Sequence, residues 1–218
     1  MKFLTYRHDG RQGLAVEAAN GSFRGALAGD DAYRGDLLSL LRSGGTALRD
    51  AARALAGMPD IDVDRVEFLP PIVNPGKIIC VGLNYQDHAS ESGIEPPLHP
   101  TIFSRFASSL TGHNAPILLP PESPQLDFEG EFVAVIGKTA RRVTKAQALD
   151  HVAGYSLFND GSIRDFQTRT SQWTMGKNFD ATGAFGPYFV SADALPPGGS
   201  GLRLETRLNG QTVQSAST

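Results

Sequence analysis

Apolar and polar residues alternate along several short stretches of the chain, a pattern that predicts a protein built mainly of strands. Residues 3–7 and 13–17 form two such stretches around a turn at Asp9-Gly10, so a hairpin is expected there. A second hairpin is expected over residues 202–214, because Asn209-Gly210 suits its turn. The chain therefore begins and ends on predicted β-structure.

Helical spacing of apolar residues is limited mainly to residues 37–41 and 47–56. Residues 22–29 are rich in turn formers. Prolines and glycines near position 70 indicate a boundary, so we expect a small module over residues 1–70 and a second domain over 71–218. Further strands are expected at 77–81, 101–106, 116–120, 126–138 and 153–160, and a further helix at 144–152 with Thr144 as N-cap.

The predicted strand at 126–138 carries unusual charges. Side chains alternate between the faces of a strand, so Asp127, Glu129 and Glu131 are expected to point the same way. Carboxylates side by side repel one another unless a cation neutralises them or one is protonated. A hard ion such as Mg²⁺ or Mn²⁺ prefers all-oxygen ligands, so the stretch indicates either a metal site or a solvated strand face.

Composition excludes some classes of partner. The 218 residues hold 20 basic and 23 acidic residues without a basic cluster, which argues against a nucleic-acid partner. No apolar run is long enough to span a bilayer, and the charged N-terminus does not resemble an export signal. Cys80 is the only cysteine and falls in a predicted buried strand, so we expect an inert thiol in a reducing cytoplasm.

Other polar residues fall where chemistry is possible. If residues 88–91 are helical, His88 and Glu91 share one face and could form a general-base dyad, although a surface pair is the alternative. Flanking glycines would let this segment move as a lid. Lys177 lies among apolar and small residues. This setting suits a lysine held at a functional site, and the alternative is a lysine whose ammonium extends to the surface. Arg105 is either a solvent-facing charge or an anion-binding group.

Several motifs occur in a specific order along the chain. They are Val81-Gly82-Leu83-Asn84-Tyr85-Gln86-Asp87-His88, Asp127-Phe128-Glu129-Gly130-Glu131, Gly154–Asp160 with Arg164-Asp165-Phe166-Gln167, and Gly176-Lys177-Asn178-Phe179-Asp180 with Phe185-Gly186-Pro187. Together they resemble the fumarylacetoacetate hydrolase family from about Lys77 onward. The resemblance implies a mainly β (α+β) fold, a rolled mixed β-structure as the catalytic domain over 71–218 behind the small α+β module, and a homodimer.

The resemblance also implies a site. Three carboxylates would hold one Mg²⁺ or Mn²⁺: Glu129, Glu131 and Asp160. A further ligand of the eponymous hydrolase would fall at Val81, so water would fill the remaining positions. Catalytic residues would be His88, Glu91 and Lys177, and substrate-binding residues would be Tyr85, Arg105, Arg164 and Gln167, although many family members have lysine where Arg105 stands.

The implied chemistry is that of an oxo acid. A 2,4-dioxo acid would chelate the metal ion, which acts as a Lewis acid on enolate charge. His88, oriented by Glu91, would activate water for attack on the distal carbonyl, and Lys177 would stabilise the oxyanion, so that a carbon–carbon bond breaks. Oxaloacetate-type decarboxylation or isomerisation on the same site is the alternative.

One departure from the family pattern concerns the end of the chain. Family members continue past the second hairpin to a Thr-Gly-Thr-Pro-like motif, and the chain stops at Thr218, so the C-terminal part of the family domain is expected to be missing. A third hypothesis is therefore a catalytically silent binding protein. The retained carboxylates, dyad and lysine argue against it.

Overall fold

The N-terminal part of the chain forms an antiparallel sheet with two helices. The computed structural model describes residues 1–85 and 98–218. The first elements are β1 (Lys2–His8), β2 (Arg11–Glu17), β3 (Phe23–Leu27), α1 (Leu37–Ser43), α2 (Ala47–Ala56), β4 (Asp60–Ile61), η1 (Val63–Arg65) and β5 (Glu67–Phe68). Asp9 and Gly10 both take positive φ in the turn between β1 and β2, which confirms the first hairpin. The turn-rich stretch at 22–29 contains β3, which pairs with β2 along its whole length.

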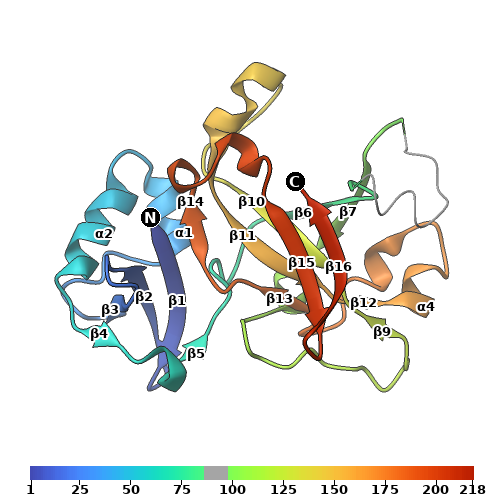
Figure 1. The fold of residues 1–218 in the computed structure, drawn as a ribbon, viewed down its shortest axis with the longest axis horizontal. Coiled ribbons are helices and arrows are strands. Elements are labelled where there is room, and N and C mark those ends of the chain that lie inside the picture. The colour runs from blue at the N-terminus through green and yellow to red at the C-terminus, as the bar shows by residue number, and fades with distance from the viewer. Residues whose placement is uncertain (86–97) are drawn as a thin grey trace.

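The two predicted helices are confirmed and cover one end of this sheet (Figure 1). Asp36 caps α1 by accepting a 2.7 Å hydrogen bond from the backbone N–H of Ser39. Leu37, Ala51 and Leu55 point into the core, where they join the buried strand residues Phe3 and Leu14. Burial of these side chains is the main force that holds the helices on the sheet.

Among the described residues, the remaining elements extend this sheet and form three two-stranded sheets. They are β6 (Ile78–Gly82), β7 (Thr101–Arg105), η2 (Ala107–Ser109), β8 (Leu110–Thr111), β9 (Leu126–Asp127), β10 (Gly130–Ile136), η3 (Lys145–His151), β11 (Val152–Asp160), β12 (Ser162–Ile163), α4 (Arg164–Gln167), η4 (Trp173–Met175), β13 (Gly183–Phe185), β14 (Phe189–Ser191), η5 (Ala192–Ala194), η6 (Pro197–Gly199), β15 (Arg203–Leu208) and β16 (Gln211–Ser217). None of the helices in the described part of the chain is both long and apolar enough to cross a membrane.

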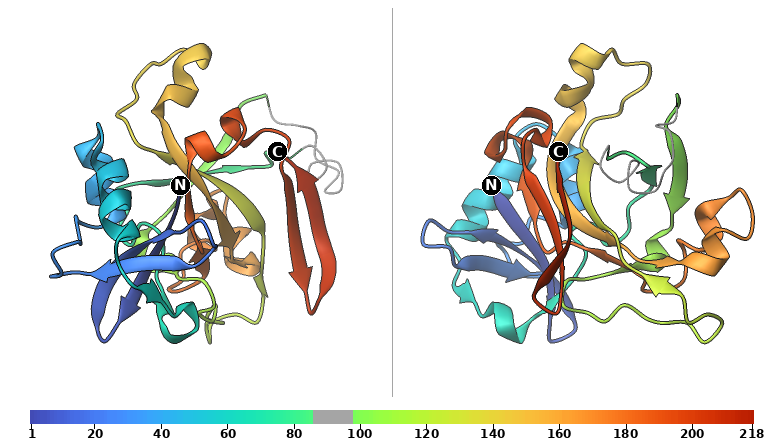
Figure 2. Two further views of the ribbon diagram at one scale, coloured as in Figure 1. Left: turned by 60° about the vertical axis from the view of Figure 1, so that its left-hand side comes forward. Right: turned by 45° about the vertical axis from the view of Figure 1, so that its right-hand side comes forward.

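One large sheet connects the two ends of the molecule. In the described residues its strands run in the order β4-β3-β2-β1-β14-β11-β13-β8, with β10 beside β11 and β5 beside β1. The link is antiparallel pairing of Phe3 in β1 with Phe189 in β14. The N-terminal strands thus continue into the sheet that holds β10 and β11, and the boundary near residue 70 stays a prediction. Figure 2 shows this continuous β-structure from two further sides. The α+β fold expected from the sequence is confirmed.

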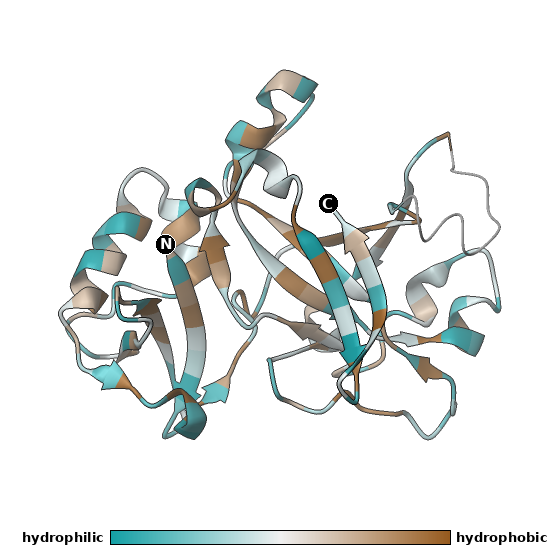
Figure 3. Ribbon diagram, viewed as in Figure 1, coloured by the Kyte–Doolittle hydropathy of each residue, from teal (hydrophilic) through white to brown (hydrophobic). Residues whose placement is uncertain are grey.

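The second hairpin is also confirmed, with β15 and β16 joined at Asn209-Gly210. Figure 3 shows hydrophilic and hydrophobic residues alternating along β15, and its Leu204 is buried. The side-chain amide of Gln214 ties the hairpin to β10, because it accepts a 3.0 Å hydrogen bond from the N–H of Gly130 and donates a 3.2 Å bond to its carbonyl. A side chain at position 130 would collide with Thr206, so glycine allows this close approach.

Several local expectations are wrong. The strand at 126–138 is broken at Phe128 and Glu129 into β9 and β10. Residues 116–120 are not a strand, and 145–151 form a 3-10 helix rather than an α-helix. Strand β6 is not buried on both faces, since Ile79 is exposed and Cys80 is half-buried.

Candidate active site

Two carboxylates meet where β10 and β11 lie side by side. Asp160 is the last residue of β11, as expected, and is buried. Glu129 lies in the break before β10 and is fastened to β11 by its backbone: its carbonyl accepts a 2.8 Å bond from the N–H of Asp160, and its own N–H donates a 3.2 Å bond to the side chain of Asn159. The break in the strand thus brings Glu129 against Asp160.

Lys177 joins these two carboxylates. Its Nζ donates a 2.8 Å hydrogen bond to Oε2 of Glu129 and another 2.8 Å bond to Oδ2 of Asp160. The side chain is only 1% exposed, and its ammonium lies 5.2 Å from the ring centroid of Phe103. The alternative of a surface lysine is therefore wrong, because this ammonium is held inside the protein by two charged partners.

Glu131 is the third predicted carboxylate and lies two residues along β10. Burial, followed by the nearby charges of Glu129 and Asp160, raises its pKa to about 7, against a smaller opposite effect of Lys177. No described residue forms an ion pair with Glu131. The cluster therefore holds a carboxylate whose negative charge is poorly compensated.

Arg105, at the end of β7, lies on the other side of Asp160. Its Nη1 donates to Oδ1 of Asp160, and the residue is buried. The sequence left open whether this arginine is a solvent-facing charge, and the structure excludes that alternative. Its predicted contact with substrate stays a prediction.

Arg164 lies at the rim of the cluster on the short helix α4, and Gln167 on the same helix is buried. Arg164 Nη1 is 2.6 Å from Oε1 of Glu129, and its Nη2 is 2.7 Å from Oδ2 of Asp127. The same guanidinium donates a 2.9 Å bond to Oε1 of Gln167. Arg164 is partly exposed, so it can also face a bound anion.

Tyr85 is half-buried near Glu131. Burial and then the Glu131 charge raise the pKa of Tyr85, while a backbone hydrogen bond from Phe132 has a smaller, opposite effect. The phenol therefore stays protonated at neutral pH and available as a donor. The predicted dyad, His88 and Glu91, lies outside the described residues, as does most of the predicted lid.

Cys80 lies on β6, close enough to the cluster to feel its charges. Burial, with a smaller contribution from Asp160, raises the pKa of the thiol to about 12. A thiol that stays protonated is a poor nucleophile, which agrees with the expectation of an inert cysteine.

The carboxylates suit a hard divalent cation. Glu129, Glu131 and Asp160 supply oxygen donors alone, and burial followed by the like charges of Glu129 and Asp160 raises the pKa of Glu131. As the side chains stand, the described residues gather no group of three His, Cys, Asp or Glu in metal-binding geometry. Two of the three carboxylates instead direct oxygens at Lys177. The donor chemistry fits Mg²⁺ or Mn²⁺, with Asp160 held in place by Arg105 and Glu129 turned from Lys177 toward the ion.

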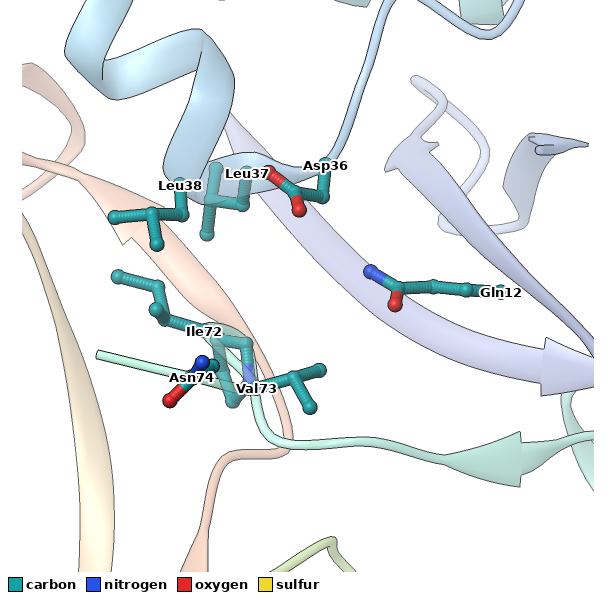
Figure 4. Close-up of a pocket in the computed structure, with 8 residues that line it drawn as sticks. Gln12, Asp36, Leu37, Leu38, Ile72, Val73 and Asn74 are labelled. Atoms are coloured by element: carbon teal, nitrogen blue, oxygen red, sulfur yellow. The ribbon is translucent and has the colours of Figure 1, made fainter. Parts of the chain in front are cut away.

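A separate cavity of about 170 Å³ lies between the start of α1 and residues 71–74 (Figure 4). Its lining is Gln12, Asp36, Leu37, Leu38, Pro71, Ile72, Val73 and Asn74. The single carboxylate there, that of Asp36, already caps α1. This cavity therefore has no feature of a catalytic site.

Sequence reasoning missed the residues that support the cluster. Asp127 was placed with the acidic residues, but its ion pair with Arg164 was not foreseen. Asn159 holds the backbone of Glu129, and Ser109 and Thr182 hold Arg105. The only available signal was the position of Asn159 next to Asp160, because the other partners come from distant parts of the chain.

Known proteins resemble this chain in sequence and in fold. The family described as fumarylacetoacetate (FAA) hydrolase C-terminal matches residues 77–218. A mitochondrial oxaloacetate tautomerase of Rattus norvegicus is 41% identical over 191 residues, which cover 87% of this chain and 61% of that protein. The chain thus spans about three fifths of the length of this relative.

Two solved structures have the same fold over the whole chain. A fumarylacetoacetate hydrolase of Exiguobacterium antarcticum is 35% identical with a TM-score of 0.82, and the match covers 100% of this chain and 75% of that one. A maleylpyruvate hydrolase of Sphingobium sp. SYK-6, in complex with a manganese(II) ion and pyruvate, is 26% identical with a TM-score of 0.78, over 100% of this chain and 76% of that one. The family model matches more than half of the chain, and the chain therefore belongs to the fumarylacetoacetate hydrolase family.

Proposed function

We propose that this chain carries the active site of a divalent-metal-dependent enzyme that stabilises the enolate of a 2-oxo acid. Glu129, Glu131 and Asp160 would hold the cation, either Mg²⁺ or Mn²⁺. The observation that carries the proposal is the meeting of Glu129 and Asp160 on Lys177 beside a Glu131 whose pKa is raised to about 7. The maleylpyruvate hydrolase crystallised with manganese and pyruvate supports an oxo acid as the substrate class.

The bound cation would act as a Lewis acid that stabilises enolate charge. Lys177 donates hydrogen bonds from a buried ammonium, so it can stabilise a developing oxyanion in a site with little water. Arg164, which is partly exposed, and the buried Gln167 beside it would hold the carboxylate of the substrate. The predicted dyad of His88 and Glu91 would take up and return the proton.

Two reactions fit this arrangement. In keto–enol tautomerisation of oxaloacetate, a proton leaves carbon 3 and another is added to the oxygen of carbon 2. The name of the rat relative favours this reaction. In hydrolysis of an acylpyruvate, water activated by His88 adds to the distal carbonyl, and cleavage yields pyruvate and a carboxylic acid. The name of the maleylpyruvate hydrolase favours that reaction. Decarboxylation of oxaloacetate uses the same enolate.

Product analysis separates these reactions. The purified chain with Mg²⁺ would be given oxaloacetate, with the enol followed by ultraviolet absorbance and pyruvate measured separately, and then acetylpyruvate under the same conditions. Faster keto–enol exchange without pyruvate supports tautomerisation. Pyruvate from oxaloacetate supports decarboxylation, and pyruvate from acetylpyruvate supports hydrolysis. Glu129→Gln should abolish any of these activities.

Failure of the proposal is equally defined. If the chain binds Mn²⁺ but turns over neither oxaloacetate nor acetylpyruvate, the proposal that it acts on these 2-oxo acids is wrong. If it binds no metal, the silent binding protein becomes the better description. The predicted homodimer and cytoplasmic location remain proposals, tested by light scattering and by cell fractionation. The name of the rat relative points instead to mitochondria.

A further inference from the structure

We propose that Arg105 is a positioning residue that fixes the orientation of Asp160 for cation binding, a role that rests on the proposed function. Arg105 does not meet solvent, since its side chain is 0% exposed, and the Asp160 side chain is 4% exposed. An ion pair so completely buried must have its geometry set by surrounding groups. The partners of the guanidinium therefore determine its orientation, and the guanidinium in turn determines that of Asp160.

All three nitrogens of the guanidinium have partners. Nε donates to Oγ of Ser109 at 3.2 Å, and Nη2 donates to Oγ1 of Thr182 at 2.9 Å. Nη1 donates to the carbonyl of Gly161 at 3.1 Å and to Oδ1 of Asp160. The contacts come from before, within and after the stretch that carries Asp160, so the plane of the guanidinium is fixed from several sides.

The slot around the guanidinium is shaped for a flat group. The ring centroid of Phe158 lies 5.1 Å from Cζ of Arg105. A Cβ added at Gly183 would lie 2.8 Å from Nη2 of Arg105 and 2.6 Å from the ring of Phe158, so glycine is what leaves room there. A lysine has a single charged nitrogen and could not reach the same set of acceptors in one plane.

This arrangement divides the two oxygens of Asp160 between two cations. Oδ1 is taken by Arg105, and Oδ2 faces Lys177 at 2.8 Å. Because Arg105 is fixed, the carboxylate cannot rotate freely about its last bond. Oδ2 is therefore presented toward Glu129, on the side where a cation would bind. Groups that orient metal ligands commonly contribute strongly to metal affinity.

A pure charge effect would act in the opposite direction. A fixed guanidinium near the carboxylates repels a divalent cation, so its removal would tighten metal binding if charge alone mattered. Positioning predicts that removal weakens binding. The sign of the change in affinity therefore distinguishes the two roles.

The test is Mn²⁺ binding to the full chain, measured by calorimetry and by the electron paramagnetic resonance spectrum of the bound ion. We expect Arg105→Met to weaken binding by roughly 10- to 100-fold, with Arg105→Lys recovering only part of the loss. Both variants should broaden the Mn²⁺ spectrum, because the ligand geometry becomes less uniform. Loss of folding alone would not alter the spectrum of the ion that remains bound.

A milder variant keeps the charge of Arg105 and disturbs the fold less than its replacement does. Thr182→Val removes one anchor of Arg105 and should weaken Mn²⁺ binding by about 3- to 10-fold, below the range for direct loss of the orienting group. Its matched control is Thr5→Val, since Thr5 is also buried and donates to a backbone carbonyl, that of Pro71, at 2.9 Å. The control should lose similar stability without a change in Mn²⁺ affinity.

Two results would overturn the inference. Equal or tighter Mn²⁺ binding by Arg105→Met would show that the guanidinium acts only as a charge. Equal weakening by Thr182→Val and Thr5→Val would show a general effect of stability. Absence of Mn²⁺ binding by the unmodified chain would instead refute the proposed function, and this inference with it.

Discussion

The buried ammonium of Lys177 neutralises part of the negative charge of Glu129 and Asp160. In the proposed function, a bound divalent cation would neutralise the charge of the same carboxylates. Lys177→Met keeps the length of the side chain and removes its charge. In the metal-free protein, this change leaves Glu129 and Asp160 without the partner that binds both at 2.8 Å. We therefore expect the variant to be strongly destabilised without metal and rescued by metal.

The magnitude follows from the burial of the pair. Removal of one partner from a buried ion pair costs about 3–5 kcal/mol, because a charge is left in a poor environment. The lower part of that range is more appropriate here, since Glu129 is still 20% exposed and also contacts Arg164. For a protein of this size, 1 kcal/mol corresponds to roughly 2–4 °C in the midpoint of thermal unfolding. The expected decrease is therefore about 6–12 °C at 3 kcal/mol.

The assay is thermal unfolding with a chelator and then with increasing Mn²⁺. A ligand present at 100 times its Kd stabilises the folded state by about 2.7 kcal/mol. The variant should gain more than the unmodified chain at equal Mn²⁺, because Lys177 no longer competes for the same oxygens. The control is Lys2→Met, since Lys2 pairs with Glu17 at 2.5 Å but is one-third exposed, and its loss should cost less than about 1 kcal/mol.

Two outcomes would refute this reasoning. If Lys177→Met and Lys2→Met lower the midpoint of thermal unfolding equally, the buried ion pairs of Lys177 contribute no more to stability than an exposed ion pair. If Lys177→Met is destabilised but Mn²⁺ raises both midpoints by the same amount, the ammonium and the cation do not compete for these carboxylates.

Three further predictions concern other parts of the molecule. Cys80, with a pKa of about 12, should react with iodoacetamide at pH 8 roughly a thousandfold more slowly in the folded protein than in urea, and equal rates would contradict the buried thiol. Glu131 has a folded-state pKa of about 7 against 4.5 in the unfolded chain, so metal-free stability should fall by at most about 3 kcal/mol as the pH rises from 4.5 through 7. Urea unfolding with a chelator measures this fall, and Glu131→Gln should remove it. Gln214→Leu should lower stability by about 1–3 kcal/mol in thermal unfolding, because both backbone groups of Gly130 lose a partner, whereas Gln211→Leu on the exposed start of β16 should have little effect.

Local patterns in the sequence predict the local elements well. The turns at Asp9-Gly10 and Asn209-Gly210 require positive φ at both positions, and glycine and asparagine accept it readily, so both hairpins were predicted. The sequence also predicts the strand that ends at Asp160, because aromatic and aliphatic residues dominate its middle part. The prediction failed at Glu129, because the interruption of the strand depends on bonds to Asn159 and Asp160 across the sheet.

Only part of the site can be predicted from the sequence. The acidic spacing suggested a cation site, and the resemblance to the family selected Asp160 and Lys177. No sequence pattern indicates that Lys177 contacts both Glu129 and Asp160, since these residues come from separate segments. The enclosure of Arg105 is likewise a product of tertiary packing, because Ser109 and Thr182 approach it from different elements.

The pairing of β1 with β14 has a consequence for the order of events during synthesis. Phe3 pairs with Phe189, so the first strand leaves the ribosome long before its partner exists. At about 5–20 residues per second, β14 follows roughly ten to forty seconds later. During that interval β1 can pair with β2, but one of its edges has no neighbour at positions 2 and 3. The nascent chain must therefore keep an open strand edge soluble until β14 has been made.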